Sequence, residues 1–164
     1  MKLVAILLIG IVVLNLWYQS QLRVKITKIT TKDELIENIG PTPFEPHLKK
    51  VNLISFWATW CTSCKTEFPE IQKLHQKWKD KGFEVISVNC DQEEDSTKAT
   101  EMYKGYGLKF PLFFDPENIF VEKFELEVLP SHLLVDAQGN ILLKMEGATQ
   151  WQSSKIQSLI QEHF

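Results

Sequence analysis

The chain has 164 residues, of which 44% are hydrophobic, and a formal charge of −3 at pH 7. This length is sufficient for one well-buried domain but not comfortably for two. Lysines and acidic residues are interspersed without a basic block, so the composition gives no indication of a nucleic-acid partner. The acidic run at residues 91–95 is interpreted as a solvated loop and helix start.

The first segment of the chain is strongly apolar. From Leu3 to Leu14 every residue is apolar except Gly10, and no charge occurs between Lys2 and Arg23. At about 1.5 Å per residue, residues 3–18 form about 24 Å of helix, slightly less than a hydrocarbon core of about 30 Å. The sequence therefore predicts a signal anchor, a transmembrane helix, over residues 1–20.

Two alternatives concern this anchor. A cleaved signal peptide is disfavoured because residues 18–20 contain no small-x-small cleavage site and no lipid-accepting cysteine follows them. The charges around the anchor conflict with an extracytoplasmic placement of the following domain. Four basic residues between positions 23 and 32 outnumber Lys2 and the amino terminus. The positive-inside rule by itself would keep the following domain in the cytoplasm.

A connector with one short helix is predicted over residues 21–46. Thr31 and Glu34 have the spacing of a capping box, and Gly40 with Pro41 is placed to end the helix. Further prolines at positions 43 and 46 make the connector stiff, and nothing in it carries chemistry.

The remainder, residues 47–164, shows the periodicities of a single domain of alternating strands and helices. We predict strands over residues 51–57, 83–90, 110–115, 131–136 and 141–145, and helices over residues 62–81, 93–106, 117–124 and 151–163. This order is typical of a three-layer α/β domain with a central mixed sheet.

Cys61 and Cys64 stand where the first strand of this domain gives way to its first helix. Two thiols at this spacing on the first turn of a helix can close a disulfide, and the helix N-terminus stabilises the thiolate of the first. Cys61 is therefore predicted as the exposed nucleophile and Cys64 as the shielded, resolving thiol of a thiol–disulfide exchange. A zinc site would need a second ligand pair, which the sequence lacks.

Several separated motifs accompany this pair. They are Phe56 to Cys61, Pro69, Val128 to Pro130, and Gly147-Ala148. Together they resemble the thioredoxin superfamily, and within it the membrane-anchored TlpA/ResA-like thiol–disulfide oxidoreductases, from about Val51 to the C-terminus. The resemblance implies a thioredoxin-like fold with a TlpA/ResA-like insertion, here around residues 110–124.

The same resemblance identifies substrate-binding residues around the dithiol: Trp60, Thr62, Ser63, Leu129 and Pro130. It implies a cis bond before Pro130, which leaves the backbone of Leu129 free to pair with an extended substrate. The hydroxyl groups at positions 62 and 63, where many relatives have a proline before the second cysteine, either bind the Cys61 sulfur or serve only as helix-start residues.

Glu67 is the third predicted catalytic residue. Thioredoxin has an aspartate six residues before its first cysteine, whereas this chain has Ser55 there, and the TlpA/ResA-like group resembles this chain in carrying a glutamate at the Glu67 position. On a helix, Glu67 shares a face with Cys64 and can accept its proton. The alternative is a solvated glutamate paired with a lysine such as Lys65.

Two further residues have open interpretations. Cys90, at the end of a strand, is interpreted as a buried core residue, with a metal ligand or a second redox partner as the alternative. His132, two residues after Pro130, is interpreted as an ordinary strand residue rather than a functional group.

These features predict a membrane-tethered thiol–disulfide oxidoreductase whose catalytic domain is extracytoplasmic, in the periplasm or on the outer face of the membrane. By resemblance its substrates are disulfides of exported proteins, such as apocytochrome c in cytochrome c maturation or copper-site cysteines, and its partner is a membrane or soluble dithiol electron donor. The alternatives are a disulfide oxidase or isomerase, or a Cu(I) chaperone using Cys61, Cys64 and His132. We expect no cofactor and no resident metal.

Overall fold

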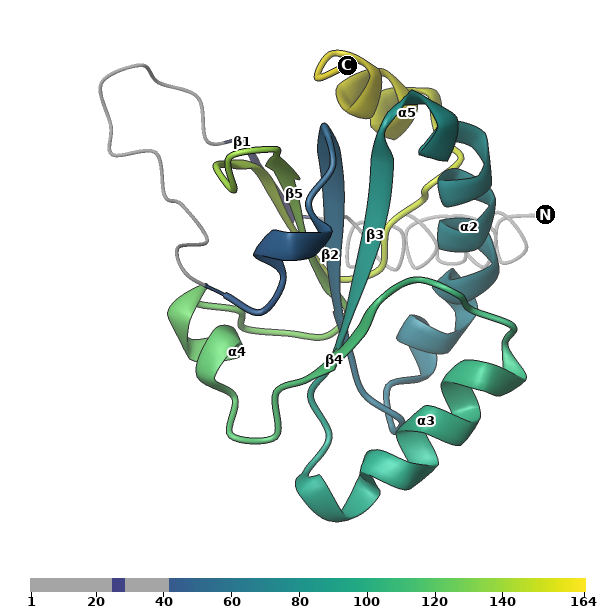
Figure 1. The fold of residues 1–164 in the computed structure, drawn as a ribbon, viewed down its shortest axis with the longest axis vertical. Helices are drawn as coiled ribbons and strands as arrows, with labels where there is room; N and C mark the ends of the chain where they lie inside the picture. The colour runs from purple at the N-terminus through teal and green to yellow at the C-terminus, as the bar shows by residue number, and fades with distance from the viewer. Residues whose placement is uncertain (1–24, 29–41) are drawn as a thin grey trace, which may run out of the picture.

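One mixed sheet forms the centre of the molecule. The computed structural model describes residues 25–28 and 42–164 (Figure 1). The sheet that these residues form has six strands, in the order β1-β6-β5-β2-β3-β4. They are β1 (Lys25–Lys28), β2 (Val51–Trp57), β3 (Phe83–Asn89), β4 (Leu112–Phe114), β5 (Ser131–Asp136) and β6 (Ile141–Glu146). Strands β2, β3 and β4 are parallel, whereas β5 is antiparallel to both β2 and β6, which confirms the predicted mixed sheet.

In the part of the chain that the structure describes, four α-helices and three short 3-10 helices surround the sheet. The α-helices are α2 (Thr62–Trp78), α3 (Ser96–Gly105), α4 (Ile119–Lys123) and α5 (Ser154–Gln161). The 3-10 helices are η1 (Glu45–His47), η2 (Lys79–Lys81) and η3 (Glu93–Asp95). The predicted helices 62–81 and 93–106 are confirmed, with η2 ending the first and η3 beginning the second, and α2 continues through Pro69.

Strand β2 separates two hydrophobic cores. All seven of its residues are buried, as expected for a central strand covered on both faces. Leu53 and Trp57 pack with residues of α2, α3 and α5, whereas Ile54 and Phe56 pack with Phe44 and with side chains at the end of α4. Since alternate side chains of a strand point to opposite faces, the two cores lie on opposite sides of the sheet. Figure 1 shows the resulting three layers, with α4 across the sheet from α2.

Part of the predicted connector belongs to the domain. Strand β1 pairs antiparallel with β6, from Lys25 opposite Glu146 to Lys28 opposite Leu143, and Phe44 is fully buried. This strand has no clear signal in the sequence, because four residues with two lysines give little periodicity and the pairing depends on the distant strand β6. Within residues 25–28 and 42–164, no helix is long and apolar enough to cross a membrane. The predicted anchor (1–20) and short helix (31–40) lie outside the described residues.

The segment predicted as an insertion provides β4 and α4. Strand β4 pairs in parallel with β3 at one edge of the sheet. Asp115 then fixes the start of α4, because its Oδ2 accepts hydrogen bonds from the backbone N–H groups of Phe120 (2.9 Å) and Val121 (3.1 Å). This places α4 and the residues after it next to the loop that follows β2.

Candidate active site

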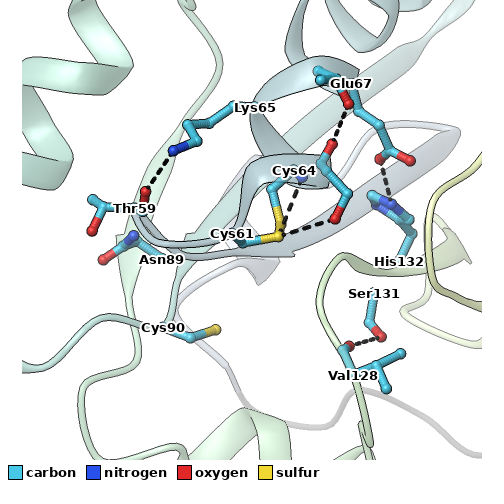
Figure 2. Close-up of a disulfide and its surroundings, with 12 residues drawn as sticks. Thr59, Cys61, Cys64, Lys65, Glu67, Asn89, Cys90, Val128, Ser131 and His132 are labelled. Atoms are coloured by element: carbon cyan, nitrogen blue, oxygen red, sulfur yellow. Dashed lines mark hydrogen bonds and ion pairs between the residues drawn. A yellow bond between two sulfur atoms is a disulfide. The ribbon is translucent and has the colours of Figure 1, made fainter.

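The two cysteines lie at the N-terminus of α2, as predicted. Cys61 is the capping residue of the helix, and it forms a disulfide with Cys64, with Cα atoms 5.4 Å apart (Figure 2). The backbone N–H of Cys64 donates a hydrogen bond to Cys61 Sγ at 3.2 Å. A helix N-terminus leaves such N–H groups without partners inside the helix, so the first sulfur lies at a position that stabilises negative charge.

The prediction that Cys61 is exposed is wrong for this disulfide-bonded form. Cys61 is 5% exposed and Cys64 is 2% exposed. Both belong to the core on the side of the sheet that α2, α3 and α5 cover, and Leu129 packs against this core. Hydrogen bonds, rather than exposure, distinguish the two sulfurs.

The two hydroxyl groups between the cysteines differ in their surroundings. Ser63 Oγ lies 3.5 Å from Cys61 Sγ, and the hydroxyl is the donor because a disulfide sulfur carries no proton. Thr62 is exposed on the surface of the helix. Of the two predicted interactions with the Cys61 sulfur, the structure therefore contains the one from Ser63.

A buried carboxylate holds the loop that leads into the dithiol. Asp91 is 3% exposed and accepts hydrogen bonds from Thr59 N (2.8 Å), Thr59 Oγ1 (3.0 Å) and Asn89 Nδ2 (2.7 Å). On the other side of the loop, Lys65 Nζ donates to Thr59 O at 3.1 Å. Asp91 thus connects the end of β3 to the turn before Cys61, so the prediction of a solvated run at residues 91–95 is wrong for Asp91.

The loop before β5 carries the predicted cis bond between Leu129 and Pro130. Ser131 Oγ donates to Val128 O at 2.6 Å, and Gly147 N donates to Pro130 O at 2.9 Å, so the loop is held at both ends. The cis bond predicted from the resemblance is confirmed.

A pocket of about 180 Å³ adjoins this loop. Its walls combine the loop before the dithiol, the loop before β5 and the segment around α4: Trp60, Cys90, Asn118, Val121, Leu126, Glu127, Val128 and Leu129. Two exposed apolar side chains stand at its rim, Trp60 at 69% and Val128 at 50% exposure. Of the predicted substrate-binding residues, Trp60 and Leu129 line the pocket, Pro130 follows directly, and Thr62 and Ser63 belong to the adjacent helix start.

Glu67 is buried one turn after Cys64. It is 4% exposed, and its Oε2 lies 3.0 Å from His132 Nε2, while its Oε1 accepts a hydrogen bond from the backbone N–H of Thr149. The alternative of a solvated glutamate paired with a lysine is wrong, because the carboxylate points inward, toward β5 (Figure 2). A buried carboxylate beside a dithiol can accept a proton.

The prediction that His132 is an ordinary strand residue is wrong, because it binds Glu67. It is 0% exposed and lies opposite Ser55 in the pairing of β5 with β2, so an imidazole from β5 and the Ser55 hydroxyl share the face of the sheet next to α2. The available signal was a single imidazole in the otherwise apolar stretch at residues 132–135. Its interaction with Glu67 joins positions 65 residues apart, which no local pattern indicates.

Cys90 has the properties of a core residue. It is a free cysteine, 8% exposed, and packs in the core that contains Ile54 and Phe56, on the side of the sheet that faces α4. Burial, and then the nearby Asp115 carboxylate, raises the pKa of the Cys90 thiol to about 12. Among the described residues no three His, Cys, Asp or Glu side chains gather as metal ligands, and His132, the third ligand of the Cu(I) alternative, binds Glu67.

Comparisons with known proteins agree with this arrangement. Residues 24–144 match the model of the AhpC/TSA family. A thiol-disulfide oxidoreductase ResA of Bacillus cereus is 34% identical over 94 residues, which cover 57% of this chain and 53% of that protein. The chain spans about half the length of the curated relatives it matches.

Solved structures with the same fold carry related descriptions. A protein described as thiol:disulfide interchange protein DsbE, from Chlorobium tepidum, aligns with a TM-score of 0.64 and 27% identity, over 70% of this chain and 79% of that chain. A protein of Neisseria meningitidis described as a thioredoxin aligns with a TM-score of 0.62 and 30% identity, over 71% of this chain and 75% of that one. The predicted thioredoxin-like α/β fold is therefore confirmed.

Proposed function

The chain belongs to the AhpC/TSA family, and we propose that it is a thiol–disulfide oxidoreductase working through Cys61 and Cys64. The observation that carries the proposal is the disulfide itself, which lies at the N-terminus of α2 beside the cis Pro130 loop and a pocket with apolar walls. The names of the curated relatives and of the structural neighbours support the same activity.

The exchange has two steps. In the first, the Cys61 thiolate attacks one sulfur of a substrate disulfide, so that a mixed disulfide forms and the other substrate sulfur leaves as a thiolate. In the second, the Cys64 thiolate attacks Cys61 Sγ, the Cys61–Cys64 bond forms, and the remaining substrate sulfur leaves. Two electrons pass from the dithiol to the substrate, and the leaving thiolates take up protons.

Cys61 performs the first attack because the helix start stabilises its thiolate. The donors present in the disulfide form, the backbone N–H of Cys64 (3.2 Å) and the Ser63 hydroxyl (3.5 Å), both point at Cys61 Sγ. Cys64 lies one turn inside the helix and has no such capping position. Glu67, buried on the same helix face, accepts the proton that Cys64 releases before the second step.

The pocket beside the dithiol receives an apolar side chain of the substrate. Trp60 and Val128 are exposed at its rim, and a large exposed apolar group next to a reactive centre is typical of a protein-binding surface. The backbone at Leu129 pairs with the substrate as an added strand, which positions the substrate disulfide over Cys61.

The proposed direction is reduction, with disulfides of exported proteins as substrates. The resemblance to anchored TlpA/ResA-like proteins supports apocytochrome c or copper-site cysteines as targets, a dithiol electron donor, and tethering through residues 1–20 with the domain extracytoplasmic. The measurement that separates a reductase from an oxidase is the reduction potential of the Cys61–Cys64 pair. We expect a value closer to about −270 mV than to about −120 mV, and the oxidising value would favour the oxidase alternative.

Activity is tested by insulin reduction with dithiothreitol as donor. We expect the chain to accelerate reduction, and Cys61→Ser and Cys64→Ser to return the rate to background. Glu122→Gln, an exposed change on α4, is the matched control and retains the rate.

The roles of the two cysteines are tested by trapping. Cys64→Ser should accumulate mixed disulfides through Cys61, because the second step is removed while the first remains. Accumulation in Cys61→Ser instead would reverse the two roles.

A further inference from the structure

We propose that His132 is a positioning residue for Glu67: its Nε2–H donates a hydrogen bond that holds the Glu67 carboxylate ready to take the proton of Cys64. The inference rests on the function proposed above, and it adds a residue of β5 to the dithiol on α2. His132 does not touch the reacting sulfur atoms in this arrangement but acts through Glu67.

The contact between the two residues is buried and direct. His132 Nε2 lies 3.0 Å from Glu67 Oε2, and the side chains are 0% and 5% exposed. The other carboxylate oxygen accepts a hydrogen bond from Thr149 N. Each oxygen of Glu67 therefore has one hydrogen-bond partner, and together the two contacts fix the orientation of the buried carboxylate.

The surroundings of the imidazole select which nitrogen carries the proton. His132 Nδ1 is buried, and no described residue forms a hydrogen bond with it. The ring packs edge-on against Trp151, with centroids 4.7 Å apart and planes at 87°. A proton on Nδ1 would be a buried donor without an acceptor, which is costly, whereas a proton on Nε2 is hydrogen-bonded to Glu67. The geometry favours the neutral imidazole with its proton on Nε2.

This arrangement supplies the proton balance of the second step. The Cys64 thiol loses its proton to Glu67, which still has an unused lone pair on each oxygen. The Cys64 thiolate then attacks Cys61 Sγ of the mixed disulfide, and the bond between Cys61 and the substrate sulfur breaks. The departing substrate thiolate takes up a proton, and Glu67 returns its own to substrate or solvent.

The elements that meet at Glu67 carry several other titratable groups. Helix α2 has Cys64, Lys65, Glu70, Lys73, His75 and Lys77, β5 has His132 and Asp136, and β6 has Lys144 and Glu146. Lys65 Nζ donates to Thr59 O at 3.1 Å, and Glu146 lies 3.8 Å from Lys144 Nζ, so both have other partners. Ser55 on β2 and Thr149 after β6 do not titrate near neutral pH. Of these groups, His132 is the one that forms a hydrogen bond with the Glu67 carboxylate among the described residues.

The test separates the two steps in the full, reduced chain. Stopped-flow reaction with 5,5′-dithiobis(2-nitrobenzoate) releases one thiolate when Cys61 attacks and a second when Cys64 displaces the bound half. For His132→Leu we expect the second release to slow about 10-fold at pH 7, below the usual range for a general base because a thiol is itself acidic. The first release stays within about 2-fold of wild type.

Two further variants make the comparison specific. His132→Gln keeps a side-chain N–H for Glu67 and should restore the rate of the second release. The pH at which this rate reaches half its maximum should be higher in His132→Leu than in wild type or His132→Gln. His75→Leu is the matched control, because it removes another imidazole bound to a glutamate, Glu84 at 3.0 Å, at the far end of α2. It should change neither release.

Several outcomes would overturn the proposal. Equal slowing of both releases, an unchanged pH profile, or slowing that adds fully to that of Glu67→Gln would make His132 a merely structural residue. If His132→Leu does not fold, nitrogen-15 spectra of the wild-type imidazole decide, since a proton on Nδ1 contradicts the assigned donor. A wild-type chain with no second release would instead refute the proposed function, because Cys64 would not resolve the mixed disulfide.

Discussion

At the residue scale, the three cysteines differ in the groups that surround their sulfur atoms. Cys61 Sγ receives the Cys64 N–H and lies 3.5 Å from the Ser63 hydroxyl, whereas Cys90 is buried next to the Asp115 and Asp91 carboxylates. All three are less than a tenth exposed. Thiolate stability, rather than access alone, should therefore decide the order in which they react.

We predict that an alkylating agent at mildly acidic pH modifies Cys61 of the reduced chain before Cys64 and Cys90. Ser63→Ala should slow this labelling by about 2- to 5-fold, a small effect because the hydroxyl lies at the limit of hydrogen-bond distance. Mass mapping of a time course gives the order, with Ser158→Ala, an exposed serine on α5, as the control. Labelling of Cys90 first, or of all three together, would contradict the assignment.

The buried thiol of Cys90 makes stability depend on alkaline pH. Its pKa is raised from 9.0 to about 12, chiefly by burial, so between these values the unfolded chain loses a proton that the folded chain keeps. The stabilisation is complete below pH 9.0 and is lost as the pH rises toward about 12. Between pH 8 and 10.5, we expect the free energy of unfolding to fall by about 2 kcal/mol less in Cys90→Ala than in wild type.

Urea denaturation of the disulfide form at both pH values measures this difference. The disulfide keeps the other two cysteines from titrating, so Cys90 alone distinguishes the two proteins. Equal losses in wild type and Cys90→Ala would mean that the thiol ionises in the folded chain as easily as in the unfolded one.

At the element scale, the loop between β2 and α2 is fixed by a partner from the end of β3. Asp91 is the common acceptor for Thr59 N, Thr59 Oγ1 and Asn89 Nδ2. The dithiol therefore depends on the neighbouring strand as well as on its own helix.

Replacing this acceptor should destabilise the fold. Asp91→Ala leaves the Thr59 N–H and the Asn89 amide buried without their acceptor, and we expect a loss of about 2–4 kcal/mol in the free energy of unfolding. Chemical denaturation measures it, with Asp95→Ala, a half-exposed carboxylate four residues later, as the control. Equal stabilities of the two variants would show that the buried network adds nothing.

At the scale of the whole molecule, the dithiol lies where the two halves of the chain meet. Strand β2 and α2 carry the cysteines and Glu67, whereas the segment from α4 to β6 contributes the pocket wall, the cis Pro130 loop and His132. The site therefore combines elements from both halves of the chain, and β1 extends the sheet with residues next to the predicted anchor.

The location of the molecule is open to a direct test. We predict that the full chain fractionates with membranes and that a reporter fused after Phe164 is active only in its extracytoplasmic form. Removing residues 1–20 should release the protein into the soluble fraction. A cytoplasmic signal would mean that the basic residues between positions 23 and 32 set the orientation, and it would refute exported proteins as substrates.

Patterns along the chain are sufficient to predict those features of this protein that depend on residues close in sequence. Periodicity placed β2 and β5 at their observed ends, and the spacing of Cys61 and Cys64 at a helix start indicated the disulfide. A resemblance supplied the cis bond at Pro130. Such features arise within a few residues, where pattern and geometry are directly linked.

Which side chains share a buried space depends on contacts that form only in the folded sheet. The sequence leaves two interpretations of Glu67, and the structure shows it buried and bound to His132. The structure likewise shows that Asp91 is the hydrogen-bond acceptor for the loop before Cys61. It also showed that Cys61 is covered in the disulfide form. These hydrogen bonds join residues about 30 to 65 positions apart. A polar group is buried at low cost in free energy only when a hydrogen-bond partner is within reach, and here the folded sheet supplies that partner.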